Sequence, residues 1–125
     1  MIDGAPIEDW LERYRRAWSS DAAEDIAGLF TRDVRYFTAP YGEPLRGVEE
    51  VQAYWVGERE SSVPWTFAHE VLAQEDDLYV VRVVVRYPAG TADAQAPEEF
   101  HDLWLVRLAG DGRAGEFVEY FMRAP

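Results

Sequence analysis

The sequence contains no cysteine and few basic residues, and each shortage excludes some kinds of protein. Without cysteine the chain has no disulfide framework, no thiolate nucleophile and no thiolate metal site. It has 12 lysine and arginine residues against 24 acidic ones, and the resulting net charge of -12 repels phosphate backbones and anionic membranes. We therefore expect neither nucleic acid nor a membrane surface among its partners.

Long apolar runs and cofactor fingerprints are also missing. The valine-rich segment from Tyr79 to Tyr87 is interrupted by Arg82 and Arg86, whereas a membrane span needs roughly 20 apolar residues. The N-terminal residues lack the basic and apolar regions of a signal peptide, so we expect a cytoplasmic protein. The sequence has no phosphate loop, dinucleotide fingerprint or serine-hydrolase elbow, and we expect no cofactor. Its two histidines, His69 and His101, fall on opposite predicted faces, so we expect no metal site.

Helical periodicity dominates the first half of the chain. With 48% hydrophobic and 14% aromatic residues, the composition suits one globular domain spanning residues 1–125. Apolar residues recur at helical spacing over residues 6–19, over a short second helix with Asp21 as its expected N-cap and Phe30 in its buried set, and from Gly47 to about Arg59. A strand from Val34 to Thr38 and a loop with two prolines separate the second and third helices.

The second half changes to a period of two residues, which is typical of β-strands. Four such runs follow one another, at Trp65 to Gln74, Tyr79 to Tyr87, Phe100 to Leu108 and Glu116 to Met122. Four consecutive strands predict an antiparallel meander. The segment 88–99 has no large apolar residue and is long for a hairpin, so we interpret it as a mobile flap or a surface excursion.

Two acids stand on otherwise apolar strand faces near the end of the chain. Alternation puts Asp102 on one face with Trp104, and Glu119 on one face with Phe117 and Phe121. Burying a carboxylate is costly unless it is paired, hydrogen-bonded or protonated. Because the two strands should be neighbours, the pattern predicts a ligand cavity that contains both carboxyls among aromatic rings.

The strand from Tyr79 to Tyr87 has two different faces. Its odd-numbered residues give one apolar face, while Val80, Arg82, Val84 and Arg86 give the other face both apolar and charged side chains. We expect this second face to form the interface of a homodimer.

The order of these elements resembles the nuclear transport factor 2-like superfamily, which includes ketosteroid isomerases and SnoaL-like polyketide cyclases. The segments that carry the resemblance are LERYRRAW in the first helix, Asp25 to Asp33, Gly47 to Val51, and the closing runs HDLWLVRL, GDGR and FVEYF. The resemblance implies an α+β fold of the cystatin-like kind, in which a cone-shaped, curved, mixed but mainly antiparallel sheet wraps around three N-terminal helices. It also implies a pocket on the concave face of the sheet and dimerisation through the convex face.

The best-defined catalytic sites of this superfamily are incomplete in the sequence. Tyr14 matches the oxyanion-hole tyrosine of ketosteroid isomerases, but Thr38 stands where they have the general base and Trp104 where they have the protonated acid. That mechanism needs both groups, so we reject it. Limonene epoxide hydrolases resemble the chain at Glu119, yet their arginine and second aspartate fall near valines of the strand from Tyr79 to Tyr87.

Asp102 and Glu119 are the candidates for acid/base catalysis, because two acids in a semi-apolar site can split their pKa values into one acid and one base. The structural alternative is that each carboxylate pairs with an arginine such as Arg35 or Arg46. SnoaL-like cyclases use a lone wall aspartate, which either acid would loosely imitate.

Two further catalytic candidates, Tyr14 and His69, would orient or polarise a substrate. Each also has an ordinary interpretation as a buried residue with a structural partner, although His69 resembles one histidine of the scytalone dehydratases. Apolar walls for a ring-bearing ligand are expected from Trp104, Tyr36, Trp55, Phe67, Val83, Phe117 and Phe121.

Two functions of different classes remain open. The first is a SnoaL-like protein that binds a small apolar or cyclic molecule and catalyses isomerisation, dehydration or cyclisation by cofactor-free proton transfer. The second is a non-catalytic ligand-binding or homodimerising module with structural acids. The volume of the cavity discriminates between them, because ligand sites typically enclose roughly 300 Å³ or more.

Overall fold

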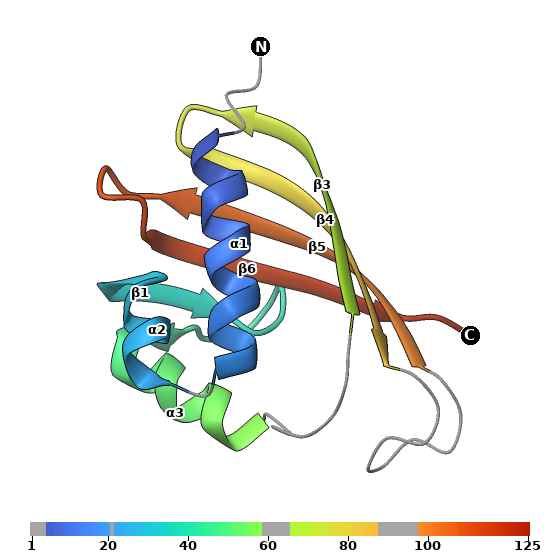
Figure 1. Cartoon of the computed structure of the whole chain (residues 1–125), viewed down its shortest axis with the longest axis horizontal. Coiled ribbons are helices and arrows are strands. Elements are labelled where there is room, and N and C mark those ends of the chain that lie inside the picture. The colour runs from blue at the N-terminus through green and yellow to red at the C-terminus, as the bar shows by residue number, and fades with distance from the viewer. Residues whose placement is uncertain (1–4, 21, 59–65, 88–97) are drawn as a thin grey trace.

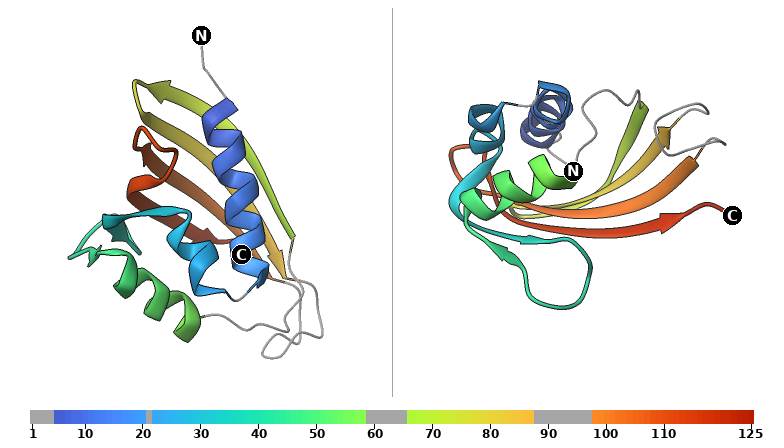
Figure 2. Two further views of the ribbon diagram at one scale, coloured as in Figure 1. Left: turned by 60° about the vertical axis from the view of Figure 1, so that its left-hand side comes forward. Right: turned by 90° about the horizontal axis from the view of Figure 1, so that it is seen from below.

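The computed structural model describes residues 5–20, 22–58, 66–87 and 98–125 (Figure 1). It consists of a curved six-stranded sheet with the helices gathered on its concave side, as the view from below shows (Figure 2). Along the chain the elements are α1 (Ala5–Ser20), α2 (Ala23–Ala27), β1 (Phe30–Phe37), β2 (Leu45–Arg46), α3 (Val48–Glu58), β3 (Thr66–Glu75), β4 (Leu78–Tyr87), β5 (Glu98–Leu108) and β6 (Ala114–Arg123).

The strand order in the sheet is β2-β1-β6-β5-β4-β3. β3, β4, β5 and β6 pair with one another in antiparallel fashion, which confirms the expected meander. β1 is parallel to β6 and antiparallel to the short β2, so the sheet is mixed but mainly antiparallel. The expected α+β fold class is therefore confirmed.

The helix α1 crosses the concave face of the sheet (Figure 1). It buries one stripe of residues, among them Trp10, Leu11 and Tyr14, at the helical spacing that the sequence predicts. The Trp10 Nε1–H group donates a 2.9 Å hydrogen bond to the Leu29 carbonyl oxygen, so this large ring is buried without an unpaired donor. Its ring also lies 6.1 Å from that of Phe117 on β6, which fixes the helix against the sheet.

Several boundaries differ from the sequence prediction, and three of the differences have a physical reason. Phe30 begins β1, whereas the periodicity placed it on the second helix; it is fully buried in either arrangement, so burial alone could not decide between them. The N-cap of α2 is Ala22, which makes no side-chain cap, and the expected cap Asp21 lies outside the described residues. β2 lies between the expected loop and the expected third helix, where the sequence predicted no strand, because a two-residue strand has no period to detect.

Only the end of the expected flap falls within the described residues. Residues 88–97 lie outside them, while Glu98 and Glu99 belong to β5. These two acids form ion pairs of 2.7 Å with Arg123 and 2.6 Å with Arg86 on the flanking strands. Among the helices described here, none is long and apolar enough to cross a membrane.

Candidate functional site

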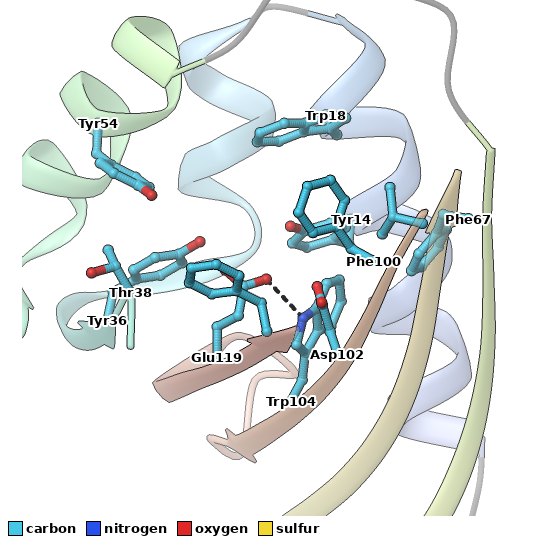
Figure 3. Close-up of a pocket in the computed structure, with 12 residues that line it drawn as sticks. Tyr14, Trp18, Tyr36, Thr38, Tyr54, Phe67, Phe100, Asp102, Trp104 and Glu119 are labelled. Atoms are coloured by element: carbon cyan, nitrogen blue, oxygen red, sulfur yellow. Dashed lines mark hydrogen bonds between the residues drawn. The ribbon is translucent and has the colours of Figure 1, made fainter. Parts of the chain in front are cut away.

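A cavity of about 320 Å³ lies between the concave face of the sheet and the helices (Figure 3). Its lining comes from elements that are distant in the sequence: α1, β1, α3 and all four strands of the meander. Eight of the lining side chains are aromatic, namely Tyr14, Trp18, Tyr36, Tyr54, Phe67, Phe100, Trp104 and Phe121; the others are Thr38, Val85, Asp102 and Glu119.

The register of β5 and β6 brings the two acids together. Asp102 lies opposite Phe121, and Trp104 lies opposite Glu119, so the two acids are diagonal neighbours on adjacent strands. Both side chains point to the concave side. Asp102 is two residues from Trp104 and Glu119 is two residues from Phe121, and these aromatic residues also line the cavity. The carboxyls and the indole of Trp104 form one polar group among the rings (Figure 3).

Hydrogen bonding within this group is incomplete. The Trp104 Nε1–H group donates a 3.0 Å hydrogen bond to Glu119 Oε2. Asp102 is only 6% exposed, and its Oδ1 atom has no hydrogen-bond partner among the described residues. A buried acceptor without a partner is costly and uncommon, so this oxygen is a point at which a ligand donor would be stabilised.

Burial raises the pKa values of both acids. Burial is the main reason why the pKa of Glu119 rises to about 8; the charge of Asp102 and the hydrogen bond between the two carboxyls raise it further, and the hydrogen bond from Trp104 opposes the rise. Burial also raises the pKa of Asp102, against hydrogen bonds with Glu119 and Trp104 that lower it. Two close carboxyls that titrate together share one proton near neutral pH, and the pair then contains one acid and one base.

Tyr36 adds a buried hydroxyl to the same cavity. Its hydroxyl oxygen accepts a 3.3 Å hydrogen bond from Trp55 Nε1, which leaves its own proton for another acceptor. Burial first, and then the charge of Glu119, raise the pKa of Tyr36 well above its ordinary value. The hydroxyl therefore stays protonated and can donate to a ligand.

The structure brings most of the candidate residues from the sequence to this cavity. Both acids and Tyr14 line it, as do the expected wall residues Trp104, Tyr36, Phe67 and Phe121. Trp55, Val83 and Phe117 instead lie fully or almost fully buried in the core behind the lining. A period of two residues assigns a face but not a depth along that face, and this is why cavity and core residues were grouped together.

His69 is placed away from the cavity lining. Its Nε2 atom lies 2.7 Å from the Glu8 Oε2 atom, so the imidazole connects β3 to the first turns of α1. The arginines that were alternative partners for the acids are also engaged elsewhere, Arg35 with Glu116 and Arg46 with Glu43. Within the part of the chain that the structure describes, neither cavity acid forms an ion pair with a basic side chain.

Several lining residues were not among the sequence candidates. Tyr54, Val85 and Phe100 belong here, and Thr38 lies in the lining although the sequence singled it out only as a replacement for a catalytic base. Trp18, one of the tryptophans that the sequence offered as aromatic walls, also lines the cavity. The signal for Phe100 was present, because it shares a strand face with Asp102. Among the described residues, no group of three or more side chains is arranged to hold a metal ion.

Two features define the class of this protein. A mixed, curved sheet wraps around the helices, and a pair of acids lies in the aromatic cavity between them. Residues 11–117 match the SnoaL-like domain family, and the chain belongs to that family. No curated protein matches the chain.

Solved structures share the fold. SalBIII, described as an epoxide hydrolase/cyclase-like enzyme in pyran ring formation in the polyether salinomycin, superposes with a TM-score of 0.74 at 12% identity, over 98% of this chain and 95% of its own. Wild-type IdmH, a candidate polyketide cyclase from Streptomyces antibioticus, gives 0.72 at 21% identity, over 94% and 91%. A loop-truncation variant of IdmH gives 0.71 at 22% identity, over 93% and 91%. At these identities the likeness shows the fold.

Proposed function

We propose that this protein binds a small, largely apolar cyclic molecule in the aromatic cavity and catalyses a proton-transfer reaction on it without a cofactor. The observation that carries the proposal is the pair formed by Asp102 and Glu119, which is buried among rings and joined to the indole of Trp104. A cavity of about 320 Å³ falls within the range of ligand sites, which supports a bound substrate over a filled cone.

The chemistry follows from the shared proton. Near neutral pH one carboxyl holds the proton and the other is ionised, so the pair can take a proton from carbon next to a carbonyl and return one to a carbonyl or hydroxyl oxygen. Isomerisation, dehydration and ring closure all need such an exchange. The Tyr36 hydroxyl, kept protonated by the raised pKa, and the buried Tyr14 are the groups placed to polarise the substrate oxygen.

The related structures support ring closure within this group of reactions. SalBIII is described with pyran ring formation and IdmH as a candidate polyketide cyclase. Both share the cone fold with this chain, and both descriptions concern ring formation.

The test is a thermal-shift screen of neutral polycyclic, terpenoid and polyketide-like compounds on the wild type, Asp102→Asn and Glu119→Gln. A ligand that binds only the folded protein raises the melting temperature. We expect the wild type to convert at least one of the compounds that bind. The turnover of that compound, measured separately, should fall at least 100-fold in both variants, because each variant removes one half of the acid/base pair. Glu116→Gln is the matched control, since it changes an acid on the same strand that pairs with Arg35 instead of lining the cavity.

No hit, together with variants as stable as the wild type, would favour the non-catalytic module. A compound that binds but is not converted would support the proposed binding site and contradict the proposed catalysis.

We also propose that the protein forms a homodimer through the convex face of the sheet. That face carries Leu103, Tyr120 and Met122, which are 39%, 43% and 72% exposed. Leu103 and Tyr120 are direct cross-strand neighbours, so their side chains form a continuous apolar surface.

A further inference from the structure

The charge in the cavity lining is negative. Its lining includes two carboxyls, Asp102 and Glu119, and no lysine, arginine or histidine among the lining residues that the structure describes. With one shared proton the pair carries one negative charge, and none of the described residues that line the cavity carries a positive charge. An anionic ligand would add a second negative charge in a poorly solvated space, so carboxylates and phosphate esters are disfavoured.

The rings of the cavity favour a positive charge. Trp18, Tyr54 and Phe100 are among the eight aromatic side chains that surround the acids. The face of an aromatic ring is negative and attracts cations, and rings gathered around one point are a recurring way to bind organic ammonium groups. This attraction is stronger where the cation is shielded from water than on an exposed surface.

The third observation concerns the unsatisfied oxygen. Asp102 lines the cavity, and its Oδ1 atom is buried and has no partner among the described residues. It needs a donor, and an N–H group that also carries a positive charge would satisfy both the hydrogen bond and the uncompensated charge.

We propose that the ligand of this cavity is a protonated amine attached to an apolar ring system, whose N–H group donates to Asp102 Oδ1 while the rings of the lining surround the cation. This inference rests on the proposed function and narrows its substrate class. It gives Asp102 a part in binding as well as in the acid/base pair, and it places the exchanged proton on Glu119.

The assignment also fits the titration of the pair. A cation beside Asp102 stabilises the ionised form of Glu119 and lowers its pKa from about 8 toward neutrality, where general acid/base catalysis is most efficient. The other titratable groups facing the site are Tyr14 from α1, Tyr36 from β1 and Tyr54 from α3; His101 acts on Asp102 from the other face of β5. Of these, none supplies a fixed positive charge inside the cavity.

Three compounds of one shape separate charge from size: 1-adamantylamine, 1-adamantanol and adamantane-1-carboxylate. At pH 7 the first is a cation, the second is neutral and the third is an anion. We expect titration calorimetry to show the amine binding the wild type at least 10-fold more tightly than the alcohol, and the carboxylate not binding. Asp102→Asn keeps the shape of the side chain but removes its charge, and should weaken the amine at least 10-fold and abolish most of its preference over the alcohol.

A second measurement does not depend on any variant. If the amine lowers the pKa of Glu119, the wild type releases protons when it binds the amine at pH 7 and releases none when it binds the alcohol. Calorimetry in buffers of different ionisation enthalpy measures this release. The affinity for the amine should rise from pH 6 to pH 9, below the titration of an alkylamine at about 10.4.

The outcomes separate this inference from the proposed function. If the alcohol binds as tightly as the amine, or the amine binds without proton release, the inference that the ligand is a protonated amine is wrong. The proposed binding of an apolar cyclic molecule is then still supported. If none of the three compounds binds and the screen of neutral rings also finds no ligand, both proposals fail.

Discussion

The Glu119 carboxyl lies where a neutral side chain is easier to bury than a charged one. Its pKa rises from 4.5 to about 8 on folding, mainly through burial, so the folded protein holds this proton more tightly than the unfolded chain does. Such a group contributes stability that is fully present below pH 4.5 and is lost as the pH rises through 8.

We therefore expect the free energy of unfolding to fall between about pH 5 and 8, by at most about 1.4 kcal/mol per pH unit from this site. Glu119→Gln resembles the protonated acid in shape and keeps an oxygen for the Trp104 N–H group, so its stability should change less over the same range. Urea unfolding of both proteins at four pH values measures the difference. Glu116→Gln should follow the wild type, and a Glu119→Gln curve parallel to the wild type would contradict the raised pKa.

Trp104 is a positioning residue for the same pair. Its Nε1–H group stabilises the ionised form of Glu119, so Trp104→Phe should raise the pKa of Glu119 above 8. Carbon NMR titration of the labelled carboxyl measures this shift directly. Trp10→Phe also removes one buried indole and its hydrogen bond, but that bond is made to a backbone carbonyl, and the pKa of Glu119 should then stay near 8.

The sequence predicted those site residues that can be found from the face of a strand on which they lie. It did not distinguish cavity residues from core residues on the same face, and it did not predict contacts between distant segments. Asp102 and Glu119 were found because an acid breaks an apolar alternation. His69 lies on the same strand as Phe67, but its partner Glu8 is on α1, and a contact between such distant segments cannot be derived from periodicity. Phe117 shares the face of Glu119 and is core because the rings of Tyr36 and Trp104 cover it, with centroids 4.7 and 5.2 Å away.

At the scale of elements, the start of α3 depends on one glycine. Gly47 has a φ of 86°, and its N–H group donates a 2.8 Å hydrogen bond to the Val34 carbonyl oxygen, which turns the chain from β2 into the helix that carries Tyr54. A side chain in this left-handed conformation is strained, and an added Cβ would also lie 3.4 Å from the Arg32 carbonyl oxygen.

Gly47→Ala should therefore lower the free energy of unfolding by about 1–2 kcal/mol. Gly110→Ala is the matched control, because an added Cβ there has nothing within 4 Å and the backbone has no positive φ. Chemical denaturation of the two variants measures the difference. Equal stabilities would show that the turn before α3 relaxes without cost.

The long elements were the predictable ones. α1 and the four strands of the meander each repeat their pattern over at least ten residues, so a boundary error of one or two residues changes little. β2 has two residues and α2 five, and both depend on contacts with β1 and α3 for their stability. The pairing of β1 with β6 is likewise a property of the folded sheet, and the resemblance to a known superfamily predicted only that the sheet is mixed.

At the scale of the whole molecule, the proposed dimer is tested on its convex face. Tyr120→Glu places a charge on the apolar surface that Tyr120 shares with Leu103, and sedimentation equilibrium should show a monomer where the wild type is a dimer. Tyr41→Ser is the control, since Tyr41 is 80% exposed on the loop after β1. A wild type that stays monomeric at high concentration would refute the dimer.

β6 lies between β1 and β5, although it follows both in the sequence. Until residues 114–123 have left the ribosome, β1 and β2 with their helices have no strand that joins them to β3, β4 and β5, and the acid pair lacks Glu119. The sheet is therefore completed only when its last strand has emerged, through contacts between distant segments that form slowly. A nascent chain that pauses before β6 presents open strand edges on β1 and β5, which other chains can pair with.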